Sequence, residues 1–178
     1  APGVCPAGAG GDTPHGVTGV PLPGLTGSHA YSQGKVAGGS AGGARRAYQQ
    51  VYVPWGMVAG KWMIGGVSFG ETAANALGMP YVLGVANGIS RARYYPDVKP
   101  IRVKLLAEPG SLRLIGAQMV GGEGIKERAD FLAMAVRVGI TLDDLATMEN
   151  VYSPPIGALN EPISVAAQNG LAAAARGS

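Results

Sequence analysis

The sequence predicts an α+β fold in which an antiparallel sheet is flanked by helices. Residues 51–69 are rich in β-branched and aromatic residues, which favour strands. Apolar and polar residues alternate in 101–108 and 112–120, and from about residue 123 the apolar spacing becomes helical. Because the strands come first and the helices follow, we expect the helices to pack on one face of the sheet.

The N-terminal segment is rich in glycine. Residues 1–27 offer few side chains to bury and lose much backbone entropy on folding, so they are predicted to be irregular. Residues 28–42 are expected to form a short helix that begins with Ser28 as N-cap and ends at Gly38 and Gly39.

The next elements are predicted from residues 51–90. Residues 51–69 indicate one or two strands. Ser68 and Glu71 have the spacing of a capping box, which predicts a helix over 71–77 that Gly78 ends. Residues 81–90, after Pro80, indicate a further strand.

The second half begins with a hairpin and ends in helices. Residues 101–108 and 112–120 are expected to pair across the turn at 108–111. A helix over 123–138, ending at Gly139, places five residues on its inner face: Ile125, Ala129, Leu132, Ala133 and Val136. Its outer arc holds Glu127, Arg128 and Asp130. Thr141 is predicted to cap a short helix over 141–148, and Pro162 lies in the first turn of a last helix over 161–175.

Composition excludes several classes of function. With 47% hydrophobic and 14% charged residues among 178, the chain has enough apolar residues for a core. The net charge of +3 is small and its cations are scattered, which argues against nucleic acid as the main partner. No apolar run approaches about 20 residues, so we expect no membrane span. Cys5 is alone and is interpreted as a bystander thiol in a reducing compartment, the cytoplasm.

The common motifs of catalytic and metal sites are not found. The glycine pairs in GAGGD, GMVAG and MVGGEG match neither a dinucleotide fingerprint nor a P-loop. His15, His29 and Cys5 are too few for a zinc site, so no metal is expected. A triad of Ser28, His29 and Asp12 has no nucleophile elbow to support it, and Asp12 also reads as a solvated turn residue.

Two tyrosine segments are the candidates for function. Tyr152 precedes Ser153-Pro154-Pro155, and these prolines stiffen the loop of residues 148–162. A stiffly presented phenol loses little entropy when it engages a partner. Tyr94 and Tyr95 lie in SRARYYP, residues 90–96. That segment is either a sheet-edge loop with solvated arginines or a site where a small anion lies on the two rings beside Arg91 and Arg93.

Several of these stretches together resemble a known family. They are GAQMVG (116–121), KERADFLA (126–133), the TLDDL helix, the YSPP loop with its following helix, SRARYYP and SHAYSQGKVAG (28–38). Over residues 26 to 170 the chain resembles the C-terminal dimerisation domain of the FAD-dependent pyridine nucleotide-disulphide oxidoreductases. The branch it resembles contains NADH oxidase, coenzyme A-disulphide reductase and polysulphide reductase.

The resemblance implies a homodimer in which the proline loop reaches the other subunit's active site. Tyr152, with Tyr94 or Tyr95 as the second position, would approach the partner's substrate and redox cysteine. Asp12 would match the acid that binds the ribityl chain of FAD, although the strand around it is degraded to glycines and a proline. Ser28, His29 and Ala30 would lie at a helix start that faces the flavin.

The resemblance also implies missing parts. Residues 1–45 would be the remnant of an FAD-binding domain with a linker helix, and residues 46–178 the dimerisation domain. The nucleotide-binding domains and the redox cysteine have no counterpart here, so we expect a truncated product or remnant that is inactive alone and binds FAD weakly or not at all. The complete enzyme would use NAD(P)H and a disulphide, polysulphide or oxygen acceptor. The alternative is a stand-alone homodimeric scaffold that binds an anionic, coenzyme A-like ligand.

Overall fold

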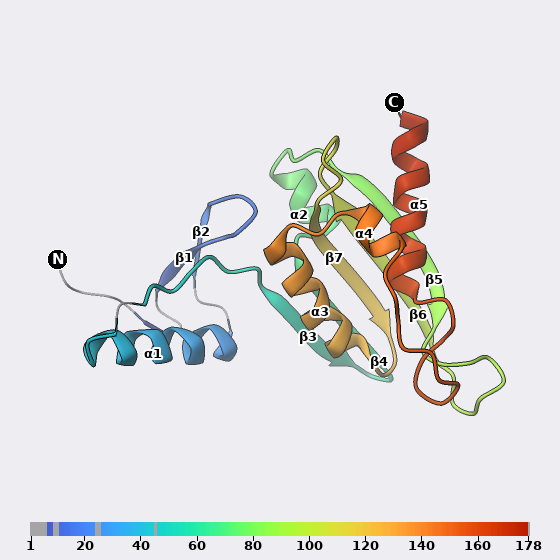
Figure 1. The fold of residues 1–178 in the computed structure, drawn as a ribbon, viewed down its shortest axis with the longest axis horizontal. Helices are drawn as coiled ribbons and strands as arrows, with labels where there is room; N and C mark the ends of the chain where they lie inside the picture. Colours follow the sequence, from blue (N-terminus) through green and yellow to red (C-terminus); the bar gives the residue numbers. More distant parts are fainter. Residues whose placement is uncertain (1–6, 9–10, 24–25, 45, 178) are drawn as a thin grey trace. The chain divides into compact units, whose positions relative to one another are not determined.

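The computed structural model describes residues 7–8, 11–23, 26–44 and 46–177 (Figure 1). The chain divides into two compact units, Ala1–Tyr52 and Val53–Ser178, hereafter unit 1 and unit 2. Each unit is described by itself. Cys5 lies outside the described residues.

Unit 1 consists of a short hairpin and one helix. Strands β1 (Asp12–Pro14) and β2 (Pro21–Pro23) pair antiparallel, so two strands interrupt the segment that was predicted to be irregular. Helix α1 (Gly27–Ala41) is capped by Thr26, whose hydroxyl accepts from the His29 amide at 3.3 Å. The prediction of Ser28 as N-cap was therefore wrong by two residues, and Ser28 lies in the first turn.

The end of α1 also differs from the prediction. Gly38 and Gly39 lie inside the helix, which continues to Ala41. A glycine ends a helix well only when it adopts a left-handed conformation. That conformation occurs at Gly43, where φ is +92°, after the Gly42 amide has donated to Gly38 O at 3.0 Å.

Unit 2 is built on a five-stranded sheet, which confirms the predicted α+β class. The strands are β3 (Pro54–Ala59), β4 (Trp62–Ser68), β5 (Val82–Ile89), β6 (Pro100–Ala107) and β7 (Leu114–Gly121). Their order is β3-β4-β7-β6-β5, and every neighbouring pair is antiparallel. The predicted hairpin of residues 101–120 is the central β6–β7 pair.

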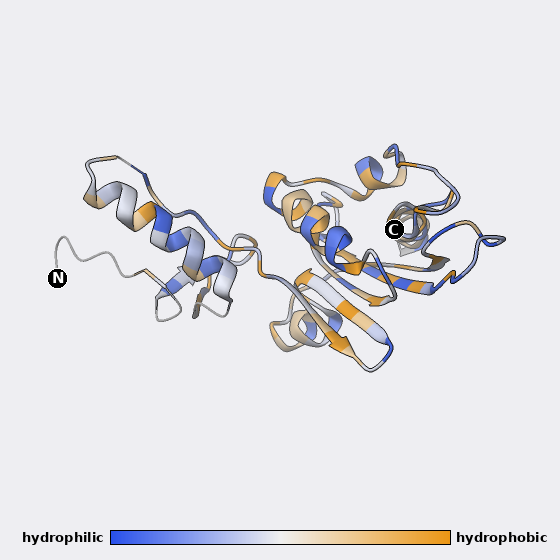
Figure 2. Cartoon of the chain, turned by 90° about the horizontal axis from the view of Figure 1, so that it is seen from below, coloured by the Kyte–Doolittle hydropathy of each residue, from blue (hydrophilic) through white to orange (hydrophobic). Residues whose placement is uncertain are grey.

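One face of the sheet carries the long helices (Figures 1 and 2). Helix α3 (Ile125–Val138) packs on β4 and β7, and helix α5 (Pro162–Gly177) packs on β5 and β6. Helix α4 (Leu142–Ala146) packs on α5, where the Ser164 hydroxyl donates to Leu145 O at 2.8 Å. The core between the layers includes Val67, Val103, Leu105, Ala117 and Leu132, all fully buried.

Close approach of α5 to the sheet depends on glycine. A Cβ atom at Gly84 of β5 would lie 2.2 Å from the Ala166 carbonyl oxygen, and one at Gly170 would lie 3.3 Å from the Gly84 Cα. Only residues without a side chain allow the two backbones to come this close. Helix α5 is therefore held directly against β5, the strand that leads into the Tyr94 segment.

Two details of unit 2 correct the predictions. Helix α2 (Glu71–Ala76) begins after Gly70, and no side chain caps it, so the Ser68 capping box was wrong: Ser68 ends β4 with φ +55°. Helix α2 also lies on the opposite face of the sheet from α3 and α5, where Glu71 forms an ion pair with Lys104. On α3 the buried position is Ala135, whereas Ala133 is half-buried.

Three helix ends in the C-terminal half lie where the sequence predicts them. Gly139 ends α3 with φ +75°. Thr141 caps α4 in a full capping box with Asp144, and its hydroxyl accepts from the Asp144 amide at 3.2 Å. Pro162 is the first residue of α5, as predicted.

Candidate functional site

The first tyrosine segment is the loop between β5 and β6. The loop is closed at its base, where the Ser90 amide donates to Lys99 O at 2.9 Å and the Lys99 amide donates to Ser90 Oγ at 3.0 Å. Inside it, the Tyr95 amide donates to Ala92 O at 2.9 Å and forms a turn. Tyr94 is 75% exposed and Tyr95 39% exposed.

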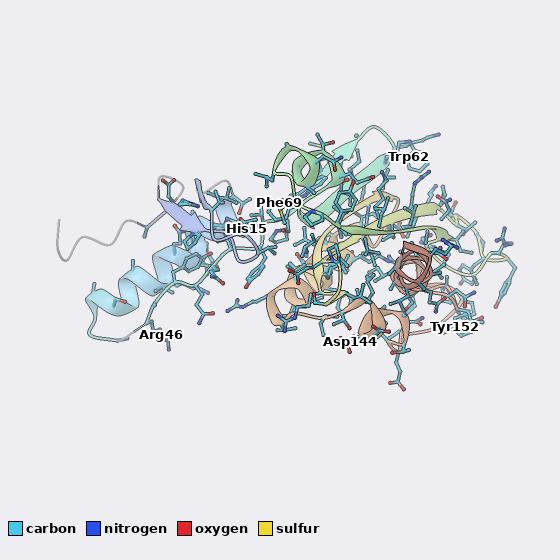
Figure 3. All side chains as sticks on the ribbon, turned by 90° about the horizontal axis from the view of Figure 1, so that it is seen from above. His15, Arg46, Trp62, Phe69, Asp144 and Tyr152 are labelled. Atoms are coloured by element: carbon cyan, nitrogen blue, oxygen red, sulfur yellow. The ribbon has the colours of Figure 1, made fainter. Side chains whose placement is uncertain are left out.

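The second segment is the proline loop between α4 and α5. The amides of Ile156 and Gly157 both donate to Ser153 O, at 3.0 and 2.9 Å, and this makes a tight turn at the two prolines. Tyr152 is 48% exposed and lies on the outside of unit 2 (Figure 3). The loop therefore presents the phenol and does not bury it.

The structure brings the two loops together at one corner of unit 2 (Figure 1). The Ala92 amide donates to Pro154 O at 3.1 Å, so one backbone hydrogen bond joins them. A hydrogen bond between the phenols of Tyr94 and Tyr152 raises the pKa of Tyr94, with smaller contributions from burial and from the charge of Tyr152. Tyr95 is not part of this phenol pair.

A pocket of about 500 Å³ opens beside the phenol pair. Its polar lining comes from Tyr94, Tyr152, Arg93, Asn87 and Asn160. Its apolar wall comes from the start of α5 and the residues before it, which include Ala158, Leu159, Pro162 and Val165. The cation, the two phenols and the two amides are suited to bind an anionic group. The apolar wall is suited to the apolar part of the same ligand.

The two arginines of the Tyr94 loop have different surroundings. Arg93 lines the pocket, whereas Arg91 does not. Arg91 forms an ion pair with Glu123 at 2.5 Å, at the end of the β7–α3 connection. Of the two arginines named from the sequence, Arg93 is therefore the one that could meet a ligand in this pocket.

The residues predicted to face a flavin lie in unit 1. Asp12 is exposed in β1, Ser28 is exposed in the first turn of α1, Ala30 is half-buried and His29 is buried. Burial lowers the pKa of His29. The first turn of α1 contains no acidic residue. A helix start without a carboxylate, with Gly27 and Ser28 exposed, fits a group that carries negative charge.

Sequence reasoning missed one pair of residues near this corner. Arg128 was placed on the outer arc of its helix, but its side chain is only 14% exposed and forms a bidentate ion pair with Glu161. The sequence signal that could have suggested this pair is Glu161, an acidic residue directly before Pro162. It lies 33 residues after Arg128 in the chain. Spacing in the sequence cannot show that such a pair meets.

The described residues contain no group of three or more His, Cys, Asp or Glu side chains that could hold a metal ion. Within the same residues, every helix is too short or too polar to cross a membrane.

Comparison with known proteins identifies the family. The profile of the pyridine nucleotide-disulphide oxidoreductase dimerisation domain matches residues 56–163. The chain is 36% identical over 145 residues to an NADH oxidase of Methanocaldococcus jannaschii, a match that covers 82% of this chain and 32% of that protein. It is 39% identical over 66 residues to a coenzyme A disulfide reductase of Staphylococcus epidermidis, covering 37% of this chain and 15% of that protein.

A solved structure gives the same answer. The NAD-dependent persulfide reductase of A. fulgidus superposes with a TM-score of 0.87 at 32% identity, over 96% of this chain and 32% of the reductase. The fold and the matched residues are those of a reductase dimerisation domain. The chain belongs to the pyridine nucleotide-disulphide oxidoreductase dimerisation-domain family, and it spans about a third of the length of the NADH oxidase and the persulfide reductase.

Proposed function

We propose that this chain acts as the dimerisation domain of a flavin-dependent NAD(P)H oxidoreductase and contributes tyrosines to the active site of the other subunit. The observation that carries the proposal is the pair of exposed phenols, Tyr94 and Tyr152, which line one pocket from two loops joined by the Ala92–Pro154 hydrogen bond. A phenol exposed at a pocket can donate a hydrogen bond to a thiolate or oxyanion, or exchange a proton with it. Tyr95 lies one residue further along the same loop and remains a secondary candidate.

The cofactor and substrates of the proposal belong to the complete enzyme. The family is FAD-dependent. Asp12, Ser28, His29 and Ala30 would lie next to the flavin, which supplies electron transfer when bound, and the helix start would favour negative charge on it. NAD(P)H would be the electron donor, and a disulphide, polysulphide or oxygen would be the acceptor. By itself the chain would be catalytically incomplete.

The first test is the oligomeric state of the chain. Light scattering across a range of protein concentrations should give twice the 17.9 kDa chain mass if the chain is a homodimer. A constant mass of 17.9 kDa up to high concentration would contradict the dimer.

The second test measures the role of Tyr152 in turnover. In a chimera, residues 26–178 would replace the matching segment of the A. fulgidus persulfide reductase. We expect Tyr152→Phe to lower kcat by about 10²-fold, within the range for a lost general acid. Tyr81→Phe is the matched control, because Tyr81 lies on a separate hollow of unit 2. Equal kcat for the two variants would contradict the proposed role of Tyr152.

A second function is favoured by Arg93. This arginine lines the pocket beside both phenols, an arrangement suited to a phosphate or carboxylate. In this alternative the chain is a homodimeric scaffold that binds an anionic, coenzyme A-like ligand and catalyses no redox reaction. Calorimetry with coenzyme A distinguishes the two: saturable micromolar binding that Arg93→Gln weakens would support the scaffold, and no binding to the isolated chain would exclude it.

A further inference from the structure

The Arg128–Glu161 pair connects α3 to the end of the tyrosine loop. Arg128 Nε and Nη2 donate to the two oxygens of Glu161 at 2.6 and 2.7 Å, and the two side chains are 14% and 12% exposed. Glu161 lies between Asn160 and Pro162, which both line the pocket beside Tyr152. A bidentate arginine–carboxylate contact fixes direction as well as distance.

Arg128 is itself held in place by the helix start. Its Nη1 donates to Gly124 O at 3.2 Å. Gly124 has φ +85°, and a Cβ atom there would lie 2.4 Å from Arg128 Nη1. The glycine therefore provides both the left-handed turn into α3 and the space that the guanidinium occupies. The five N–H donors of an arginine lie in one rigid plane, so bonds from Nε, Nη1 and Nη2 leave the side chain little freedom.

The other tyrosine loop is tied to the same segment. Glu123, directly before Gly124, forms the ion pair with Arg91 at 2.5 Å, and Arg91 lies three residues before Tyr94. Arg91 Nε is buried and has no hydrogen-bond partner among the described residues, and the ion pair with Glu123 restrains this guanidinium. Two residues at the start of α3 therefore contact the two loops. Glu123 pairs with Arg91 of the Tyr94 loop, and Arg128 pairs with Glu161 of the Tyr152 loop.

Few side chains of either loop are buried. In residues 91–99, a range that the structure describes throughout, only Ala92 is buried, and in the fully described range 148–161 only Ala158 is. Apolar packing therefore contributes little to the position of either loop. The positions of the two loops are therefore fixed mainly by polar contacts, which include the hydrogen bond from the Ala92 amide to Pro154 O.

We propose that Glu123 and Arg128, at the start of α3, are positioning residues that set the separation of Tyr94 and Tyr152 through Arg91 and Glu161. The proposal rests on the proposed function, in which these phenols act. The two contacts are unequal. Glu123 is 76% exposed, so its pair with Arg91 is screened by water, whereas the Arg128–Glu161 pair is largely shielded. Arg128 and Glu161 should therefore dominate.

The test compares fold stability with ring geometry in the 178-residue chain. Arg128→Met with Glu161→Leu replaces the pair by apolar side chains of similar size, a change that can leave stability nearly unaltered. Tyr94 and Tyr152 line the same pocket, and NMR on a tyrosine-labelled chain detects the proximity of their rings as a cross-peak. We expect the ring–ring cross-peak to be lost and the pKa of Tyr94 to return toward its ordinary value, while the denaturation midpoint stays close to that of the wild type.

The control pair is Lys126–Asp130, an exposed (i,i+4) ion pair on the same helix. Lys126→Met with Asp130→Leu should leave the cross-peak intact. A cross-peak of wild-type intensity in the Arg128→Met/Glu161→Leu chain would overturn the proposal. If that chain does not fold, Arg128→Lys replaces it: the charge stays and the bidentate contact is lost, so an unchanged cross-peak would again overturn the proposal.

The smaller contribution is tested separately. Arg91→Gln should shift the Tyr94 resonances and leave those of Tyr152 in place, and unshifted Tyr94 resonances would overturn the role of Glu123. These readouts need no turnover. A failed positioning test would leave the chimera result standing, and an active Tyr152→Phe chimera would remove the proposed function without altering the ring geometry.

Discussion

Units 1 and 2 bury different kinds of side chain. The buried residues of unit 2 are mostly apolar and lie between the sheet and the helices. In unit 1 the described buried side chains are Thr13, His15, His29 and Gln33, with Val51 as the apolar member. Figure 2 shows the same difference, since α1 is mostly pale or blue while the strands of unit 2 carry orange residues. Apolar burial stabilises unit 2, and buried hydrogen bonds stabilise unit 1.

This difference has a physical consequence for tolerance to change. Apolar cores respond to lost volume, whereas buried polar contacts respond to a lost partner. Substitutions should therefore affect the two units by different mechanisms, and each unit can be perturbed while the other reports as an internal control.

The largest effect is expected from the core of unit 2. Leu105 is fully buried in β6, so Leu105→Ala should lower the free energy of unfolding of unit 2 by about 2–5 kcal/mol through lost burial and the remaining cavity. Amide exchange followed during a denaturant titration measures the free energy of unfolding of each unit separately. Val138→Ala, at an exposed position of α3, is the control. A cost below that of the control would show that the sheet–helix interface is not the main source of stability.

A smaller effect is expected from the polar interior of unit 1. Gln33 donates to Thr13 Oγ1 and accepts from the Gly8 amide, both at 2.8 Å, which ties α1 to β1 and to the residues before it. Gln33→Ala should cost unit 1 about 1–3 kcal/mol, because both partners lose their bond. Ser32→Ala, exposed on the same helix, should cost little. Loss of amide protection in unit 2 would contradict the division into separately stabilised units.

The N-caps of α1 and α4 are both threonines, but they make different hydrogen bonds. Thr141 and Asp144 cap each other's backbone, so Thr141→Ala should destabilise unit 2 by about 1 kcal/mol. Thr26 makes a one-sided cap on α1 with a 3.3 Å contact, and Thr26→Ala should cost less. The reverse ranking, measured by the same titrations, would show that the reciprocal contact adds nothing.

The smallest effect is expected from mild acid, and it should appear in unit 1. Burial lowers the pKa of His15 and His29 below the 6.5 of an exposed histidine, so the unfolded chain binds protons first as the pH falls. The contribution of these neutral histidines is present above pH 6.5 and is lost as the pH falls through their folded pKa values.

Unit 2 has no histidine and should respond only at lower pH. Hydrogen bonds from Thr141 lower the pKa of Asp144 below 3.8, so its contribution is lost only as the pH falls below that value. Amide exchange at pH 7 and pH 5 compares the units. Equal loss of protection in both between these pH values would contradict the assignment to the histidines.

The sequence predicted the features that depend on residues close together in the chain. Alternation over residues 101–120 predicted the central hairpin, and Gly139, Thr141 and Pro162 predicted three helix ends. Ser68 failed as a cap because its backbone continues β4 and ends in a left-handed conformation, and the pairing of β4 with β7 overrides the local motif. Gly38 failed as a helix end for the related reason that glycine is also compatible with a helix interior.

The candidate site was predicted only in part. Tyr94 and Tyr152 were each proposed from their own loops, and the family resemblance linked them, but their shared pocket is formed by residues far apart in the sequence. Arg128 and Glu161 were missed for the same reason. The role of Asp12, Ser28, His29 and Ala30 toward a flavin stays a prediction.

The most direct test of the central claim is complementation between two inactive subunits of the persulfide reductase chimera. One subunit carries Tyr152→Phe and keeps the redox cysteine expected for the family, and the other keeps Tyr152 and has that cysteine replaced by serine. If Tyr152 serves the neighbouring subunit, the mixed dimer regains turnover well above either parent, because its intact cysteine faces an intact phenol. If Tyr152 serves its own subunit, the mixed dimer stays as inactive as the parents, and the proposed role of Tyr152 in the other subunit's active site is wrong.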